Sequence, residues 1–409
     1  MKMILRGSVC VLGTLLTLSS ASPALAQKVT EVPDLTGKQV LATLANPATA
    51  VSVGEIMGAM IATEVATAPF GTSAGGFVFK LDPATGLLAR TTTTFGPSFT
   101  EHALTSGEGK ISVGATFNST SYDKLSDFAL KEMPMGSAAG ITPGVAGTTT
   151  ADLHITSRTL AISALIGVTQ NLDVGTVVPL VSVKLSGVST LINASDQVAR
   201  LAQTDNVFSG IGDIAAFAKY RFVRFKGPDI PDPGGVALYV STRLPTGSRD
   251  NLRGLGVTRT LGSIVASFGT SVFRPHGSVG FEYWSKSVDV AGLGGSNTVK
   301  LRHQFQYAGG VEIAAAPKLT VLADVLGQNI MGGGPVVLGT LTPVTGIPGI
   351  SASQSLALQE DGITKLFFVP GLKVNLKAKM VLSLNALVTL KNNGLHSKVV
   401  PVAGINLTM

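Results

Sequence analysis

The sequence lacks several features that mark common protein classes. It has one cysteine in 409 residues, and charged residues make up only 13% of the chain. Beyond the N-terminal 26 residues, no 18 consecutive apolar residues occur, and the most apolar stretch, residues 55–70, contains Glu55 and Glu64. These absences argue against a disulfide framework and against helical membrane spans.

The first 26 residues predict a secretory signal peptide. They contain two basic residues, an apolar run over residues 9–18 and the small-x-small sequence Ala24-Leu25-Ala26. The only cysteine, Cys10, lies inside this segment, so we expect a mature chain without a thiol and without a zinc-cysteine site.

The charge of the predicted mature chain is weakly basic. Without Lys2 and Arg6 it has 29 basic against 24 acidic residues, a net charge of about +5. Because the chain is predicted to be exported, we expect no nucleic-acid partner. Outer-membrane lipid and lipopolysaccharide are the expected partners for its charge.

What the sequence does contain is alternation of apolar and polar residues over long segments. In residues 110–119, Ile111, Val113 and Phe117 share one parity, and residues 212–222, 234–244 and 303–313 show the same pattern. Each segment has about ten residues, which is the length that a tilted strand needs to cross a bilayer.

The connections between these segments are of two kinds. Short turns are predicted at 168–174, 225–235, 273–279, 313–321 and 374–380. Long Gly- and Ser-rich connections are predicted at 123–150, 189–209, 246–259, 289–301 and 331–362. Short turns at one end and long loops at the other are typical of outer-membrane barrels.

The pattern predicts an all-β fold, an antiparallel transmembrane outer-membrane β-barrel. The twelve expected strands cover residues 110–122, 151–169, 172–188, 210–225, 234–245, 260–273, 277–288, 302–315, 318–330, 363–376, 379–391 and 398–409. A soluble β-sandwich is the alternative, but its solvent face would carry more charge than the Ser, Thr, Gly, Asn and Gln seen here.

The alternation continues through VVPVAGINLTM, residues 399–409. A closed barrel explains this, since its last strand must pair with its first. The same segment resembles the signal that the barrel assembly machinery recognises, with Gly404 followed by Leu407, although Met409 stands where that signal has an aromatic residue. We therefore expect the assembly machinery to be a partner.

Residues 27–109 form a predicted N-terminal plug or periplasmic segment ahead of the barrel domain, residues 110–409. Residues 34–48 predict a short helix capped by Asp34 or Thr36, and residues 76–95 predict a hairpin. Three interpretations are open: a plug in the lumen, two further strands that would make fourteen, or a loosely ordered extension.

Four segments carry a resemblance to a known family. FGPSFTEHALTSGEGKISVGATF (95–117), NLDVGTVVPL (171–180), GIGDIAAFAKYRF (210–222) and LPTG (244–247) resemble proteobacterial outer-membrane barrels associated with meta-pathway phenol degradation. That family is related to the fatty-acid and aromatic-hydrocarbon transporters. The resemblance covers residues 95–409 and implies a monomeric barrel that passes small, often hydrophobic, molecules.

Nothing in the sequence predicts an enzyme. GTSAG, residues 71–75, matches the nucleophile-elbow motif around Ser73, but no strand-to-helix turn is predicted there. The five histidines show no metal-ligand spacing. We expect no catalytic residues, no bound metal and no cofactor.

Seven charged side chains are predicted to point into the lumen. They are Lys219, Arg221, Arg243, Glu282, Glu312, Asp324 and Lys373. In one interpretation they pair with one another, as buried charges usually do. In the other, unpaired basic members favour solutes that carry a carboxylate or phenolate.

Two predicted extracellular loops are notably apolar, residues 131–147 and 331–350. They either pack against each other as a lid or meet lipid or a hydrophobic ligand. Together with the predicted luminal aromatics they supply the candidate solute contacts, Met133, Met135, Phe217, Tyr239 and Leu338.

The sequence thus predicts an outer-membrane transporter for small hydrophobic or amphipathic molecules, such as aromatic compounds or fatty acids. A general diffusion porin and a non-conducting structural barrel are the alternatives.

Overall fold

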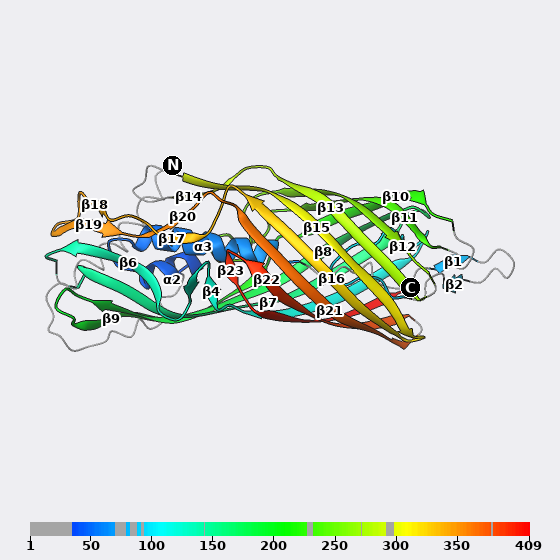
Figure 1. Ribbon diagram of the computed structural model, residues 1–409, viewed down its shortest axis with the longest axis horizontal. Helices are drawn as coiled ribbons and strands as arrows, with labels where there is room; N and C mark the ends of the chain where they lie inside the picture. Colours follow the sequence, from blue (N-terminus) through cyan, green and yellow to red (C-terminus); the bar gives the residue numbers. More distant parts are fainter. Residues whose placement is uncertain are drawn as a thin grey trace.

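The computed structural model describes residues 35–69, 79–81, 88–90, 94–142, 144–226, 232–270, 272–291, 298–377 and 379–409. In this part of the chain, twelve long antiparallel strands form a closed barrel (Figure 1). In order around the barrel they are β3 (Ile111–Ser121), β7 (Gly147–Gly167), β8 (Leu172–Ile192), β10 (Ala215–Arg224), β11 (Gly234–Arg243), β12 (Arg259–Phe268), β13 (Phe273–Trp284), β15 (Thr298–Ala316), β16 (Leu319–Met331), β21 (Ile363–Lys377), β22 (Met380–Asn392) and β24 (Val399–Thr408).

The barrel closes where β24 pairs with β3, with Ala403 opposite Phe117. Each strand coincides with a predicted one, so the prediction of twelve strands is confirmed. The alternative of fourteen is wrong, because the predicted hairpin forms β1 (Phe79–Leu81) and β2 (Leu88–Arg90), which pair with each other in a separate two-stranded sheet. The predicted signal peptide, residues 1–26, and the GTSAG stretch lie outside the described residues.

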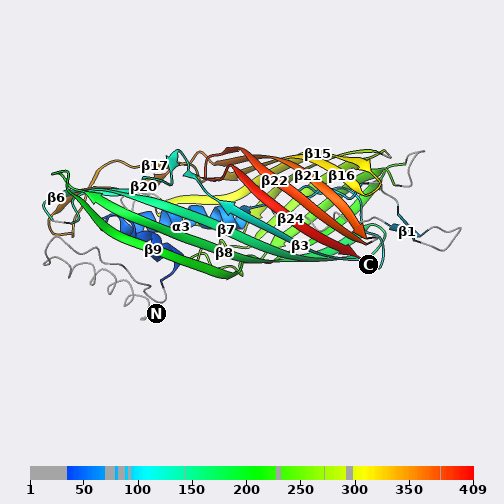
Figure 2. The ribbon, with the colours of Figure 1, turned by 90° about the horizontal axis from the view of Figure 1, so that it is seen from below.

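The two ends of the barrel differ as predicted, with one turn misplaced. The predicted turn at 273–279 lies within β13, and the chain turns between Phe268 and Phe273 instead. Between β7 and β8, β12 and β13, and β15 and β16, the chain turns within a few residues, and the C-terminus lies at this short-turn end (Figure 1). Ten further strands of the described chain lie outside the twelve barrel strands and the β1–β2 hairpin, and Figure 2 shows β6, β9, β17 and β20 among them at the long-loop end. They are β4 (Lys124–Leu125), β5 (Phe128–Ala129), β6 (Met133–Gly140), β9 (Val198–Ile211), β14 (Val288–Ala291), β17 (Val336–Leu338), β18 (Thr342–Pro343), β19 (Ile350–Gln354), β20 (Leu356–Leu358) and β23 (Leu395–His396).

The outer wall of the barrel is apolar. Large hydrophobic side chains of the outward parity are exposed, for example Phe117 at 45%, Tyr220 at 50% and Leu238 at 40%, while Ser112, Lys219 and Ser241 of the inward parity are buried. Exposed apolar side chains on every second residue of a closed barrel are what a surrounding bilayer requires. The fold is therefore an outer-membrane-type transmembrane barrel.

Two helices lie inside the barrel at its long-loop end (Figures 1 and 2). Helix α2 (Gly37–Thr43) begins at Thr36, whose side chain forms a capping box with Gln39, so of the two predicted caps Thr36 is correct. Helix α3 (Ala50–Thr67) was not predicted. It has the length and composition of a membrane span, but 72% of it is buried within the molecule.

The two helices pack closely because α3 has glycine where α2 crosses it. A Cβ on Gly54 would lie 2.8 Å from the Lys38 carbonyl oxygen and 3.0 Å from the Ala42 Cβ. One turn later, a Cβ on Gly58 would meet the Lys38 side chain at 3.4 Å. Only the missing side chain at Gly54 therefore allows the backbones of α2 and α3 to approach this closely.

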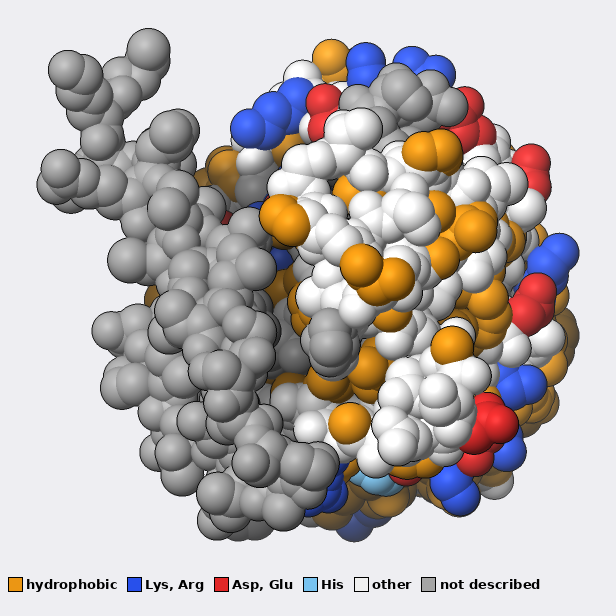
Figure 3. Space-filling view, turned by 90° about the vertical axis from the view of Figure 1, so that its left-hand side faces the viewer, with side chains coloured by type: hydrophobic (Ala, Val, Ile, Leu, Met, Phe, Trp, Pro, Cys, Tyr) orange, Lys and Arg blue, Asp and Glu red, His pale blue; other side chains and the backbone are white. Residues whose placement is uncertain are grey.

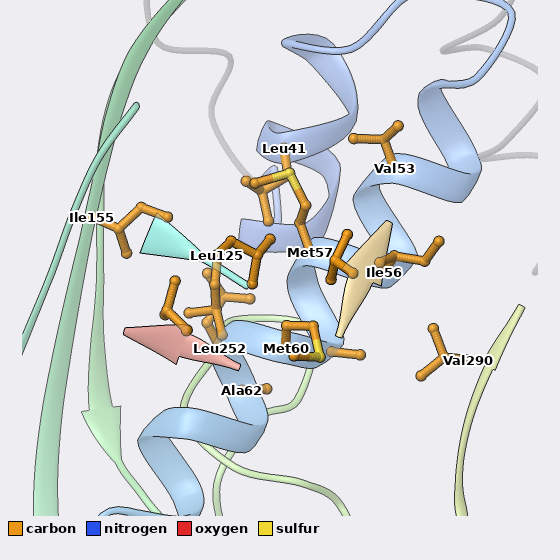
Figure 4. Close-up of a cluster of buried hydrophobic side chains, with 14 of the residues drawn as sticks. Leu41, Val53, Ile56, Met57, Met60, Ala62, Leu125, Ile155, Leu252 and Val290 are labelled. Atoms are coloured by element: carbon orange, nitrogen blue, oxygen red, sulfur yellow. The ribbon is translucent and has the colours of Figure 1, made fainter. Parts of the chain in front are cut away.

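A hydrophobic core forms around α3 (Figure 4). Leu41 from α2 and Ile56, Met57 and Met60 from α3 are buried together with Leu125, Ile155, Leu252 and Val290 from the strands and loops around them. We call the half of the barrel toward the long-loop end the upper half. It is thus filled like the interior of a soluble domain.

Candidate functional site

The last turn of α3 ends against four side chains from four different strands. Arg243 and Arg259 each donate a hydrogen bond to the Ala66 carbonyl oxygen, at 2.8 and 2.9 Å. Gln328 donates to the Thr67 carbonyl oxygen at 3.3 Å, and Lys365 donates to the Thr67 hydroxyl at 2.9 Å. Cationic groups at a helix C-terminus stabilise it, because they satisfy the last carbonyls and oppose the negative end of the helix dipole.

An ion pair reinforces this contact. Lys365 Nζ lies 2.7 Å from Glu64 Oε2, one turn before the end of α3. Lys365 is buried, and the Glu64 side chain is only 11% exposed. The C-terminal end of α3 is therefore fixed to the barrel wall at a defined height.

The lower half of the lumen, toward the short-turn end, is filled by residues 94–106, which we call the luminal segment. This segment has no regular secondary structure and is buried throughout. Several of its contacts with the wall are polar. Ser106 N donates to Asp173 Oδ2 at 2.9 Å, and Ala103 N donates to Ser267 Oγ at 3.1 Å. Lys373 Nζ donates to the Pro97 carbonyl oxygen at 2.7 Å. The segment thus contacts β8, β12 and β21.

Glu101 is the charged centre of the luminal segment. Its Oε2 lies 3.2 Å from Lys219 Nζ, and both side chains are buried. Burial raises the pKa of the Glu101 carboxyl above its ordinary value of 4.5, while Lys219 acts in the opposite direction. The proton affinity of Glu101 therefore depends on the luminal segment remaining packed against the wall.

All seven predicted luminal charges point inward, and the structure gives most of them partners within the barrel. Arg221 donates to both carboxylate oxygens of Asp232, at 2.8 and 2.9 Å. Glu282 lies 3.4 Å from Arg259, and Asp324 lies 3.0 Å from His276. This arrangement fits the interpretation in which the luminal charges satisfy one another.

Several luminal groups were missed at the sequence level. Lys365, Arg274 and His276 share the parity of predicted luminal residues on their own strands, so the alternation could have found them. Glu64 and Glu101 lie outside the barrel strands, where alternation carries no information.

The predicted solute contacts fall in three places. Met133 and Met135 are fully buried in the hydrophobic core around α3. Phe217 and Tyr239 form a tilted aromatic pair in the lumen, with ring centroids 5.7 Å apart. Leu338 is 42% exposed at the long-loop end. The structure therefore does not bring these five residues into one site.

Described residues of the two predicted apolar loops lie against each other. Residues 133–140 form β6, which pairs with β19 where the second loop ends, with Gly140 opposite Ile350. Residues 133–151 and 331–359 contain no Asp, Glu, Lys, Arg or His. We call these two stretches the uncharged flap. In the view onto the long-loop end, uncharged side chains occupy the middle of the face and charged ones its edge (Figure 3).

No protein-family model and no curated protein matches the chain. Among solved structures, an outer membrane channel from Pseudomonas putida F1 is similar, with 11% identity and a TM-score of 0.45, covering 75% of this chain and 98% of that one. The Ralstonia pickettii toluene transporter TbuX shows 13% identity and a TM-score of 0.35, covering 84% and 98%. The β domain of the Bordetella autotransporter BrkA shows 10% identity and a TM-score of 0.36, covering 74% and 100%. Likenesses this weak assign no solute to this chain.

Proposed function

We propose that the protein is an outer-membrane channel for the uptake of small hydrophobic or amphipathic molecules, with residues 27–109 as its plug. The observation that carries the proposal is the luminal segment, a stretch of the chain that fills the lower lumen and is held there by a few polar contacts. Water can replace the hydrogen bonds and the ion pair that hold the segment, because each contributes only modestly to stability, and its apolar contacts with the wall are those of Phe95 and Phe99.

The chemistry of the long-loop end supports a hydrophobic solute. The uncharged flap exposes Ile141 at 89% and Leu341 at 56%, which is unfavourable in water unless these side chains meet an apolar partner. The core beneath the flap is apolar, and Phe217 and Tyr239 offer aromatic rings lower in the lumen. Met133 and Met135 support the flap from within, and Leu338 is the candidate contact on its surface.

A general diffusion porin fits less well, because it needs an open aqueous lumen and this lumen is filled. A non-conducting structural barrel stays a second candidate. The paired luminal charges favour it, since spare charge is what a permanently open pore for ions would present. The surrounding partners that we propose are lipopolysaccharide and outer-membrane lipid, with assembly of a monomer guided by the C-terminal strand.

Uptake into Gram-negative cells that produce the protein separates these functions. We expect radiolabelled toluene to enter faster than in cells with an empty vector, with no matching gain for glucose. A larger gain for glucose would favour the porin, and no gain for either compound would favour the structural barrel.

A further inference from the structure

One apolar patch lies apart from the core around α3, lower in the lumen. It consists of Leu326, Phe367, Val369, Leu387, Val400 and Val402. These residues belong to the neighbouring strands β16, β21, β22 and β24, and the register places Leu326 opposite Phe367 and Leu387 opposite Val400. The patch therefore forms one continuous area of the inner wall.

Phe99 is the hydrophobic side chain of the luminal segment that covers this patch. Phe99 packs against it and is only 8% exposed. Phe95, four residues earlier in the same segment, is buried elsewhere, against Val381. The phenyl ring of Phe99 thus occupies an apolar area of the wall that becomes accessible when the luminal segment moves.

Polar atoms around the patch are buried without a hydrogen-bond partner among the described residues. Asp324, opposite Val369 in the register, leaves Oδ2 unpaired, and Gln328, two residues from Leu326, leaves Oε1 unpaired. Asn385, opposite Val402, leaves Oδ1 unpaired. Asp324 and Gln328 are at least nine-tenths buried. All three atoms are acceptors, and a hydrocarbon ring such as that of Phe99 has no hydrogen-bond donor to offer them.

Leaving several acceptors unpaired is costly, whereas a ligand that supplied one donor would recover part of that cost. We propose that this patch is a luminal binding site for a small molecule with a ring of phenyl size and one hydrogen-bond donor, and that Phe99 occupies the site in its absence. The inference deepens the proposed function, on which it rests, by naming the chemistry of the solute. The solute's ring replaces Phe99 on the patch, and its donor reaches one of the unpaired acceptors.

A cysteine reporter tests the site without measuring uptake. The only natural cysteine is Cys10, so Ala308→Cys, beside the patch, supplies one thiol in the mature barrel. In this background, Phe99→Ala should raise the rate of modification by N-ethylmaleimide about tenfold or more, because exposure controls thiol access. Phe95→Ala is the matched control and should leave the rate near that of the parent.

Protection of the Ala308→Cys thiol against N-ethylmaleimide, measured in the Phe99→Ala background, then shows which ligand chemistry the site prefers. At equal free concentration, benzyl alcohol should slow the modification about fivefold more than toluene, the equivalent of about one net hydrogen bond. A merely apolar patch would favour toluene. Gln328→Leu or Asn385→Leu should remove the preference for the alcohol. Heat-modifiable gel mobility verifies that each variant is folded, and Phe99→Leu replaces Phe99→Ala if the latter does not fold.

The outcomes separate the site from the transport function. Equal modification in the Phe99 and Phe95 variants, or better protection by toluene, would overturn the binding site even if cells take up aromatic compounds. If benzyl alcohol protects the thiol but cells that produce the protein take up no toluene, the binding site would be supported and the proposed transport function would be contradicted.

Discussion

The upper and lower halves of the lumen are filled in opposite ways. The upper half holds α2 and α3 in an apolar core, with polar contacts at the end of α3 and at Asn46 and Thr49 between the two helices. The lower half holds the irregular luminal segment, whose contacts with the wall include ionic and hydrogen-bonded ones together with the apolar contacts of Phe95 and Phe99. Apolar packing excludes water, whereas polar contacts can be exchanged for water at little net cost. We therefore expect the helices of the upper half to stay fixed and the luminal segment of the lower half to be the part that moves.

The largest effect is expected from a cavity in the hydrophobic core around α3, in the upper half. Ile56→Ala should destabilise the helical half by about 2–5 kcal/mol, because it leaves a cavity in a packed core. Thermal unfolding followed by circular dichroism should show the helical signal lost at lower temperature, while the barrel signal keeps its midpoint. Val51→Ala, at a position on α3 that is 68% exposed, should change neither. A single shared transition in both variants would show that the halves are not independent.

The next largest effect is expected at the ion pair between Lys219 and Glu101, in the lower half. Lys219→Met leaves the Glu101 carboxylate buried without its partner, which costs about 3–5 kcal/mol. The luminal segment should then leave the wall more often, and single-channel recordings should show more frequent opening. The double variant Lys219→Met with Glu101→Gln should recover much of the closed behaviour. Fewer openings in Lys219→Met than in the wild type would contradict a gating role for this pair.

The packing of the luminal segment against the wall should also depend on pH. Because burial raises the pKa of Glu101 above its ordinary value of 4.5, the packed segment binds this proton more tightly than a hydrated one. This stabilisation is fully present below the ordinary pKa and is lost as pH rises through the raised pKa. Opening should therefore increase with pH over that window, and Glu101→Gln should flatten the dependence. An equally steep profile in Glu101→Gln would assign the pH response to another group.

The smallest effect on stability is expected at the flap. Leu338→Ser, at a side chain that is 42% exposed, should change the free energy of unfolding by less than about 0.5 kcal/mol. If the flap captures solute, the initial rate of toluene uptake should still fall. Met133→Ser is the contrasting variant, because it places a hydroxyl in the apolar core and should destabilise the helical half instead. Unchanged uptake with Leu338→Ser would remove this residue from the solute path.

The barrel could be predicted because alternation is a local signal that every strand repeats. The strand positions, the parity of Lys219 and Glu312, and the number of strands all follow from it. The helices and the luminal segment could not be predicted in the same detail. Helix α3 is apolar on most sides because it is buried within the barrel, so it lacks the one-sided pattern that identifies a surface helix.

The candidate site shows the same limit. Met133 and Met135 were predicted as solute contacts because they lie in an apolar loop, but the structure buries them against the helical half. Phe99 and Glu101 were not singled out, because nothing in the sequence near them indicates that residues 94–106 return into the lumen. Contacts between an irregular segment and a distant wall depend on tertiary structure, which a local pattern does not contain.

We expect that the luminal segment must leave the wall for solute to pass. Ala103→Cys with Ser267→Cys tests it directly, because the Ala103 amide and the Ser267 hydroxyl are 3.1 Å apart and the predicted mature chain has no other thiol. Oxidation should lock the segment to β12 and abolish uptake of toluene, and a reductant should restore it. Uptake that stays the same when the disulfide is quantitatively formed would contradict the account.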